Sequence, residues 1–134
     1  MIAGLWLSLT FLCCAGSGLE KSKSVPPNPS ISVSAEQLIS EYKDNEIAAD
    51  QKYKGKLIQV TGRVDHVGKD IVDSMYVTVK GKGKYEFVTV QCFFDDSWAT
   101  RLSYLSEDYP ITVQGTCDGK FGNVLLKSCE FPSR

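Results

Sequence analysis

The 134-residue sequence offers few side chains for catalysis or metal binding. Its single histidine, His66, has no carboxylate or thiol at metal-ligand spacing. Asp95 and Asp96 directly precede a short segment with helical periodicity, where carboxylates are typical helix caps rather than a metal pair. The sequence has no Gly-rich phosphate loop, no Cys-x-x-Cys motif and no nucleophile–base signature. It therefore predicts a protein that is not an enzyme and that uses no metal or cofactor.

A second set of residues has the composition of a binding surface. Aromatic residues are interleaved with lysines over residues 63–91, which is typical of a platform on which single-stranded bases stack. The candidate residues are Arg63, Lys69, Tyr76, Thr78, Lys80, Lys82, Lys84, Tyr85, Phe87, Thr89 and Gln91. Six basic residues face four acidic ones between Lys56 and Glu86, so the local positive charge is small.

Three interpretations of this candidate face stay open. It binds an oligosaccharide, a peptide or a protein; it binds single-stranded nucleic acid; or it binds nothing. In the last case an N-terminal helix covers Phe87 and Phe93, and the lysines keep a sheet edge soluble. The overall balance of fifteen basic and sixteen acidic residues, a net charge of −1, argues against a duplex-DNA binder.

The chain divides into three parts by composition. Residues 1–17 resemble a signal segment, because the uncharged apolar stretch 2–15 is shorter than the roughly twenty residues that span a membrane. Residues 18–33 are rich in Ser, Pro, Gly and Lys and predict a flexible linker, and residues 34–134 predict one folded domain. Cys14 stands where a lipoprotein carries its lipid, but the residues before it match that pattern poorly. A membrane tether and free secretion to the periplasm or cell envelope are therefore both open.

The folded part is predicted to begin with a helix. Ser34 is a typical N-cap, with Gln37 in the capping-box position, and one helix is expected from there to about Tyr53. From residue 56 the apolar period changes to two, which predicts a strand. Gly62, on its inner face, is expected to let the strand bend sharply, and His66 is expected on the same face at its end.

Four more strands follow. They are expected at residues 75–80, 87–94, 111–117 and 124–131, with a short helix after Asp95 and a turn at 118–122. This order predicts a mainly β fold: a five-stranded OB-fold barrel with an N-terminal helix and a short helix between strands three and four. The outer face of strands two and three is the usual binding surface of an OB fold, and most candidate residues fall there.

Several short blocks of the folded part are distinctive. They are Asn45-Glu46, Ala48-Ala49-Asp50, Tyr53-Lys54-Gly55-Lys56, Val60-Thr61-Gly62, Val90-Gln91-Cys92-Phe93, Val113-Gln114-Gly115-Thr116-Cys117 and Ser128-Cys129. These blocks resemble the tRNA-anticodon-binding-like OB-fold family, whose members are mostly uncharacterised bacterial exported proteins and lipoproteins. The resemblance covers residues 35–131 and implies the OB fold. Its motifs are mainly structural, so it implies little about the ligand.

Three cysteines remain if Cys13 and Cys14 leave with the signal. A straight hairpin centred near Lys120 would set Cys117 and Cys129 too far apart to bridge. Strands three and five of an OB barrel run parallel, and Cys92 and Cys129 both lie near their ends. We therefore predict a Cys92–Cys129 disulfide in an oxidising compartment; the alternative is three buried thiols.

Taken together, the sequence predicts a non-catalytic binding or interaction module that is exported to the cell envelope. Its partner would be a protein, a peptide or a glycan. The competing hypothesis is a single-stranded nucleic-acid-binding OB-fold protein.

Overall fold

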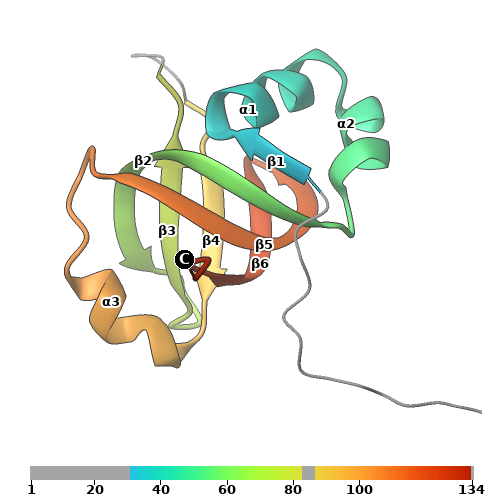
Figure 1. Cartoon of the computed structure of the whole chain (residues 1–134). Helices are drawn as coiled ribbons and strands as arrows, with labels where there is room; N and C mark the ends of the chain where they lie inside the picture. Colours follow the sequence, from blue (N-terminus) through green and yellow to red (C-terminus); the bar gives the residue numbers. More distant parts are fainter. Residues whose placement is uncertain (1–30, 83–86, 134) are drawn as a thin grey trace, which may run out of the picture.

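Five strands of the protein close into a barrel, and a sixth short strand is added at its edge (Figure 1). The computed structural model describes residues 31–82 and 87–133. The elements are β1 (Ile31–Ser34), α1 (Ala35–Asp44), α2 (Glu46–Tyr53), β2 (Leu57–Lys69), β3 (Met75–Lys80), β4 (Val90–Phe94), the 3₁₀ helix η1 (Asp96–Trp98), α3 (Ala99–Ser103), β5 (Pro110–Phe121) and β6 (Asn123–Glu130). The strand order is β2–β3–β4–β6–β5, and pairing of β5 with β2 closes the barrel. The predicted OB fold is confirmed.

The long strand β2 closes the barrel because it pairs along both edges. Residues 57–63 pair with β5, and residues 63–69 pair with β3 on the opposite edge. Ile58, Val60 and Val64 are at most 1% exposed, which confirms the predicted inner face. Gly62 is needed for space: a Cβ there would lie 2.5 Å from Val79 Cγ1 and 2.9 Å from Ala35 Cβ.

A bulge in β2 overturns the prediction for His66. The pairing register with β3 shifts between Val64 and His66, so that the next inward residue is Val67, opposite Val77. His66 therefore lies exposed on the outer face rather than at the barrel mouth. The extra residue at the bulge reverses the alternation, which period-two reasoning alone cannot foresee. The irregularity in pairing lies between Val64 and His66, whereas the sharp bend was predicted at Gly62.

The N-terminal helical segment is two helices, not the one helix predicted. Ser34 caps α1 as expected, its side chain accepting a hydrogen bond from the Gln37 backbone N–H at 3.1 Å. Asn45 adopts an extended conformation that ends α1, and its side chain accepts from the Ala48 N–H at 3.0 Å to begin α2. One residue thus caps both helices, which turns the second helix away from the first.

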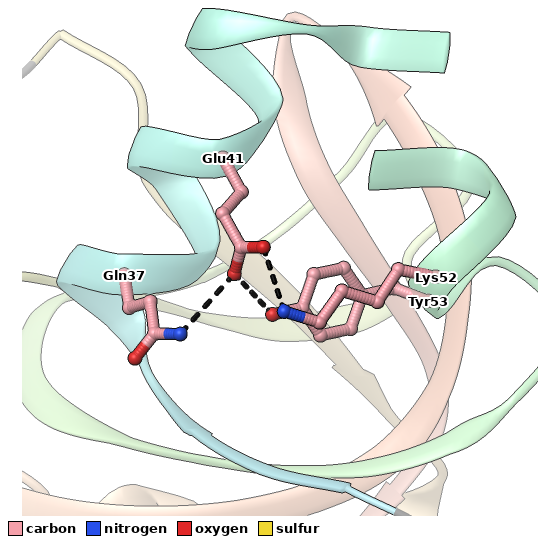
Figure 2. Close-up of polar contacts among 4 residues, drawn as sticks. All are labelled: Gln37, Glu41, Lys52 and Tyr53. Atoms are coloured by element: carbon pink, nitrogen blue, oxygen red, sulfur yellow. Dashed lines mark hydrogen bonds and ion pairs between the residues drawn. The ribbon is translucent and has the colours of Figure 1, made fainter. Parts of the chain in front are cut away.

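Polar contacts hold the two helices together (Figure 2). The Glu41 carboxylate accepts hydrogen bonds from Lys52 Nζ at 2.8 Å, from Gln37 Nε2 at 3.4 Å and from the Tyr53 hydroxyl. Burial raises the pKa of Glu41, but the hydrogen bonds from Lys52 and Tyr53 lower it by more, so the net shift is downward. The helices therefore meet as one unit.

The unit formed by α1 and α2 covers one end of the barrel, away from α3 (Figure 1). Its apolar residues Leu38, Ile39, Tyr42, Ala49 and Tyr53 are at most 2% exposed and belong to the single core cluster. Burial of these side chains stabilises the fold by about 1.5–3 kcal/mol for each large one.

Strand β1 was not predicted, because residues 31–33 were assigned to the linker. It runs parallel to β2, with Ile31 opposite Ile58 and Val33 opposite Val60. Val33 is 7% exposed and joins the core. Residues 31–33 of the predicted linker are therefore part of the sheet.

The hairpin of β5 and β6 turns later than predicted. Phe121 pairs with Asn123 around Gly122, whose φ is +74°, so residues 118–121 belong to the strand rather than to the turn. Two register shifts follow along the hairpin, and Cys117 lies opposite Leu126 instead of Asn123.

The predicted short helix is confirmed as η1 followed by α3. Asp95 caps it by accepting a hydrogen bond from the Ser97 N–H at 2.9 Å. Trp98 packs edge-on against Phe94 and Phe131, with ring centroids 6.1 and 5.4 Å apart. Within residues 31–82 and 87–133, no helix has the length and apolar character needed to cross a membrane.

Candidate functional site

A row of three rings crosses the outer face of β2, β3 and β4. His66, Tyr76 and Phe93 each come from a different strand, and both neighbouring pairs of ring centroids are 6.1 Å apart. We call these three residues the aromatic row. The rings of Tyr76 and Phe93 meet edge to face, a favourable aromatic geometry.

Gly68 makes room for this row. It pairs with Tyr76 across the strands, and a Cβ there would lie 3.0 Å from His66 Nε2 and 3.3 Å from the Tyr76 hydroxyl. The bulge turns His66 outward, and the glycine lets its imidazole approach the backbone. The predicted face therefore gains a histidine that sequence reasoning had placed inside.

The polar residues predicted beside this row are tied into the sheet. Thr78 is 7% exposed, and its hydroxyl donates to Asp65 Oδ2 at 3.2 Å. Asn123 accepts from the Thr89 N–H at 3.0 Å and donates to Gln91 Oε1 at 3.3 Å. These groups are already satisfied by the protein, so they position the face more than they offer contacts to a ligand.

Two of the predicted lysines are paired with carboxylates. Lys80 Nζ lies 2.8 Å from Asp108 and 3.7 Å from Glu107, and Lys69 Nζ lies 3.2 Å from Asp73. The hydrogen bond to Asp108 raises the pKa of Lys80, and the same contact lowers the pKa of Asp108. The positive charge available to a polyanion on this face is therefore smaller than the sequence indicated.

Of the remaining predicted residues, the structure describes Arg63, Lys82 and Phe87. Arg63 and Lys82 are exposed. Phe87 is 96% exposed, so the interpretation in which an N-terminal helix covers it is wrong. Lys84 and Tyr85 lie outside the described residues, as do Cys13 and Cys14 and the signal-like segment.

The turn between β2 and β3 borders the aromatic row with two exposed apolar side chains. Asp70 Oδ1 accepts from the backbone N–H groups of Val72 at 3.0 Å and Ser74 at 2.8 Å, which fixes the turn. Ile71 and Val72 at its tip are 102% and 72% exposed. This loop is one of the two that usually frame the binding face of an OB fold.

A groove of about 1030 Å³ lies elsewhere, between α3 and the outer face of β2 and β5. Gln59 and Thr61 of β2 and Thr112 of β5 are among the strand residues that line it, and Trp98, Arg101, Tyr104 and Tyr109 line it from the helix and the loop that follows. Sequence reasoning missed this groove. The signal was present in Trp98, Tyr104 and Tyr109, three aromatic residues within one short helix-loop segment.

The three cysteines of the described segments are free and buried. Cys92 and Cys129 face the core from β4 and β6, which run parallel, and burial and hydrogen bonding with Cys129 raise the pKa of Cys92. Gly115 leaves space for this pair, because a Cβ there would lie 2.6 Å from Cys129 Sγ. The Cys92–Cys129 disulfide stays a prediction. Within the residues that the structure describes, no three His, Cys, Asp or Glu side chains are grouped to hold a metal ion.

No curated protein sequence matches the chain. A Klebsiella pneumoniae protein described as a "putative nucleic acid-binding lipoprotein" matches with 19% identity and a TM-score of 0.62, over 78% of this chain and 93% of its own. An OBody bound to hen egg-white lysozyme matches with 16% identity and a TM-score of 0.46, over 62% of this chain and 87% of its own.

The blocks that resemble a known family have structural roles here. Asn45 caps two helices, Asp50 accepts the Tyr42 hydroxyl at 3.0 Å, Tyr53 is buried, and Gly55 has a φ of +82°. The tRNA_anti-like family model matches residues 8–130. The chain therefore belongs to the tRNA_anti-like family.

Proposed function

We propose that the protein is an exported, non-catalytic binding module of the cell envelope whose partner docks on the aromatic row. The observation that carries the proposal is the row itself: His66, Tyr76 and Phe93 lie side by side on the outer face of the barrel, with ring centroids 6.1 Å apart. Aromatic rings on a rigid sheet give large contact area at low entropic cost, and they are enriched where proteins bind partners.

The surroundings of the row favour a partner of low charge. Lys69 and Lys80 have carboxylate partners within 4.0 Å, and the fixed turn carrying Ile71 and Val72 adds apolar surface beside the row. A peptide, protein or glycan surface fits this mixture better than a polyphosphate chain does.

Site-specific photo-crosslinking in cells tests this proposal. A photo-reactive phenylalanine analogue at Phe93 should give a discrete adduct, and the same analogue at Ile47, which is 74% exposed on α2, should not. Tyr76→Ala should remove the Phe93 adduct. Equal adducts from both positions, or an adduct that survives Tyr76→Ala, would overturn the role of the row.

Export is supported by the uncharged apolar segment 2–15 and the Ser-, Pro- and Gly-rich residues after it. Cell fractionation after growth with a labelled fatty acid distinguishes a lipid-anchored protein from a freely secreted one. Label on the protein indicates a lipid anchor at Cys14, and unlabelled protein in the periplasm indicates free secretion. Recovery of the whole chain in the cytosol would contradict export.

The cysteines provide an independent measure of the compartment. In an oxidising compartment, Cys92 and Cys129 would form one S–S bond by giving two protons and two electrons to a thiol oxidase. Alkylation without reduction followed by mass spectrometry should then leave Cys117 alone labelled among the three. Labelling of all three in protein from that compartment would end the disulfide hypothesis.

Single-stranded nucleic acid is the second candidate partner. The exposed rings of the aromatic row and the description of the Klebsiella pneumoniae protein favour it, and each base that stacks on a ring would contribute about 1–3 kcal/mol. Titration of Tyr and Trp fluorescence with an oligo-dT at low and moderate salt tests it. A response that weakens with salt and disappears in Tyr76→Ala supports this candidate, and no response removes it.

A further inference from the structure

The groove beside α3 shares no residue with the aromatic row, and its chemistry is different. We propose that it is a second binding site, which takes an oligosaccharide carrying a carboxylate. This inference goes beyond the proposed function, because it assigns a ligand class to a surface that the aromatic row does not need.

The floor of the groove offers uncharged hydrogen-bonding groups from two paired strands. Gln59 and Thr61 alternate with the core residues Ile58 and Val60 and therefore point outward. Thr112 lies opposite Thr61, and their hydroxyl oxygens are 3.3 Å apart. Hydroxyl and amide groups both donate and accept, which suits the hydroxyl groups of a sugar.

Aromatic side chains form the walls. Trp98 is held in place by its edge contacts with Phe94 and Phe131. Tyr104 and Tyr109 are 82% and 55% exposed, so their ring faces are open to a ligand. Rings with one polar atom pack well against the C–H faces of pyranose rings, while the polar atom stays hydrated or bonded.

Arg101 gives the groove its charge preference. Among the described residues that line the groove, it alone has a charged side chain. Its guanidinium lies 4.5 Å from the centre of the Phe131 ring, which fixes its position. In the described part of the chain, no carboxylate lies within 4.0 Å of it. A planar guanidinium left without a partner is suited to a ligand carboxylate.

Two other ligand classes fit less well. A peptide could not bind by adding a strand to the floor, because β2 and β5 already pair with each other from Leu57–Thr116 to Arg63–Pro110. A nucleic-acid strand would meet one cation, Arg101, among the described residues that line the groove, which is too little positive charge for several phosphates. The groove, at about 1030 Å³, is large enough for more than one sugar ring.

A matched pair of disaccharides tests the inference on the full chain. N-acetylglucosaminyl-N-acetylmuramic acid carries one carboxylate, and di-N-acetylchitobiose is its neutral counterpart. Isothermal titration should show the acidic disaccharide binding about tenfold more tightly, since a hydrogen bond to a charged group is the difference. Arg101→Gln should remove this preference, and Arg101→Lys should keep part of it.

Two further variants locate the site. Thr61→Val, on the exposed floor, should weaken both disaccharides by a similar factor, and Tyr76→Ala, in the aromatic row, should weaken neither. Equal affinity for the two sugars in the unmodified protein, no binding of either, or loss of binding in Tyr76→Ala would each overturn the inference. Failure of the photo-crosslinking experiment at Phe93 would leave these predictions unchanged, because the two surfaces share no residue.

Discussion

Two pairs of tyrosines, one on the helices α1 and α2 and one beside α3, have opposite roles. Tyr42 and Tyr53 are at most 2% exposed, and their hydroxyls donate to Asp50 and Glu41. Tyr104 and Tyr109 are 82% and 55% exposed. The same side chain therefore fastens one end of the barrel and lines a groove at the other.

The difference between these pairs is where the phenol finds its partner. A buried hydroxyl must bond to the protein, because leaving it unpaired costs about 1–3 kcal/mol. An exposed hydroxyl bonds to water and can exchange that bond for one to a ligand. Substitutions at the closed end should therefore reduce stability, and substitutions at the groove should reduce binding alone.

The largest expected effect comes from the closed end. Tyr53→Ala should lower the free energy of unfolding by about 3–5 kcal/mol, because it empties a fully buried aromatic site. Tyr104→Ala is the matched control and should change stability by less than about 0.5 kcal/mol. Urea unfolding measures both. Similar losses in the two variants would mean that Tyr104 also fastens the fold, and the comparison would fail.

The inner and outer faces of β2 should differ in the same way. Gly62→Ala places a Cβ 2.5 Å from Val79 Cγ1 and 2.8 Å from the Lys80 carbonyl oxygen, and should destabilise by about 1–3 kcal/mol. Thr61→Ala, one residue earlier on the exposed face, is the control and should be nearly neutral. Thermal unfolding measures the loss of stability in each of the two variants. A neutral Gly62→Ala would show that Val79 and the Lys80 backbone of β3 can shift to make room, and the expected difference between the two faces would be absent.

Removing only the hydroxyl of a buried or an exposed tyrosine should also give different effects on stability. Tyr42→Phe removes the donor to Asp50 at 3.0 Å and the contact with Cys117 Sγ at 3.5 Å. The expected loss is about 0.5–1.5 kcal/mol. Tyr109→Phe removes an exposed hydroxyl and should leave stability unchanged. Chemical denaturation measures the stability of both variants. An equal loss of stability in the two would contradict the roles assigned to the buried and the exposed hydroxyl.

The smallest effect is a pH dependence at the contact between α1 and α2. Because the pKa of Glu41 is lowered in the folded protein, its contribution is present above the unfolded pKa of about 4.3 and is lost as the pH falls through the folded value. Glu41→Gln should therefore cost up to about 1 kcal/mol at pH 7, and less as the pH falls toward 3. Denaturation at several pH values measures this. Glu36→Gln, on the exposed side of α1, is the control, and a pH-independent cost in Glu41→Gln would exclude the charge as its source.

Much of the fold could be predicted because local rules were not opposed by long-range contacts. The alternation of Ile58, Val60 and Val64 with polar residues identified the inner face of β2, and the Ser34 and Asp95 caps identified two helix starts. The bulge beside Val64, the pairing of β1 and the turn at Gly122 escaped prediction. Each of these depends on a partner strand whose register the sequence does not state.

The candidate surfaces were likewise predictable only where they depend on a single strand. Tyr76 could be placed on an outer face from its own strand, whereas His66 joined it only because the bulge reversed its direction. The groove depended on bringing Gln59 and Thr61 beside α3, which begins about forty residues later in the chain. The hydrophobic periodicity of one segment does not indicate which distant segments will lie beside it.

By itself, the sequence determined the order of helices and strands, the inner residues of most strands and the balance of charge, since these follow from side-chain type at short spacing. Only the tertiary structure decided which lysines are neutralised, which tyrosines are exposed and where a groove opens. Those properties arise from distances between residues far apart in the chain, and closing the barrel is the step that fixes them.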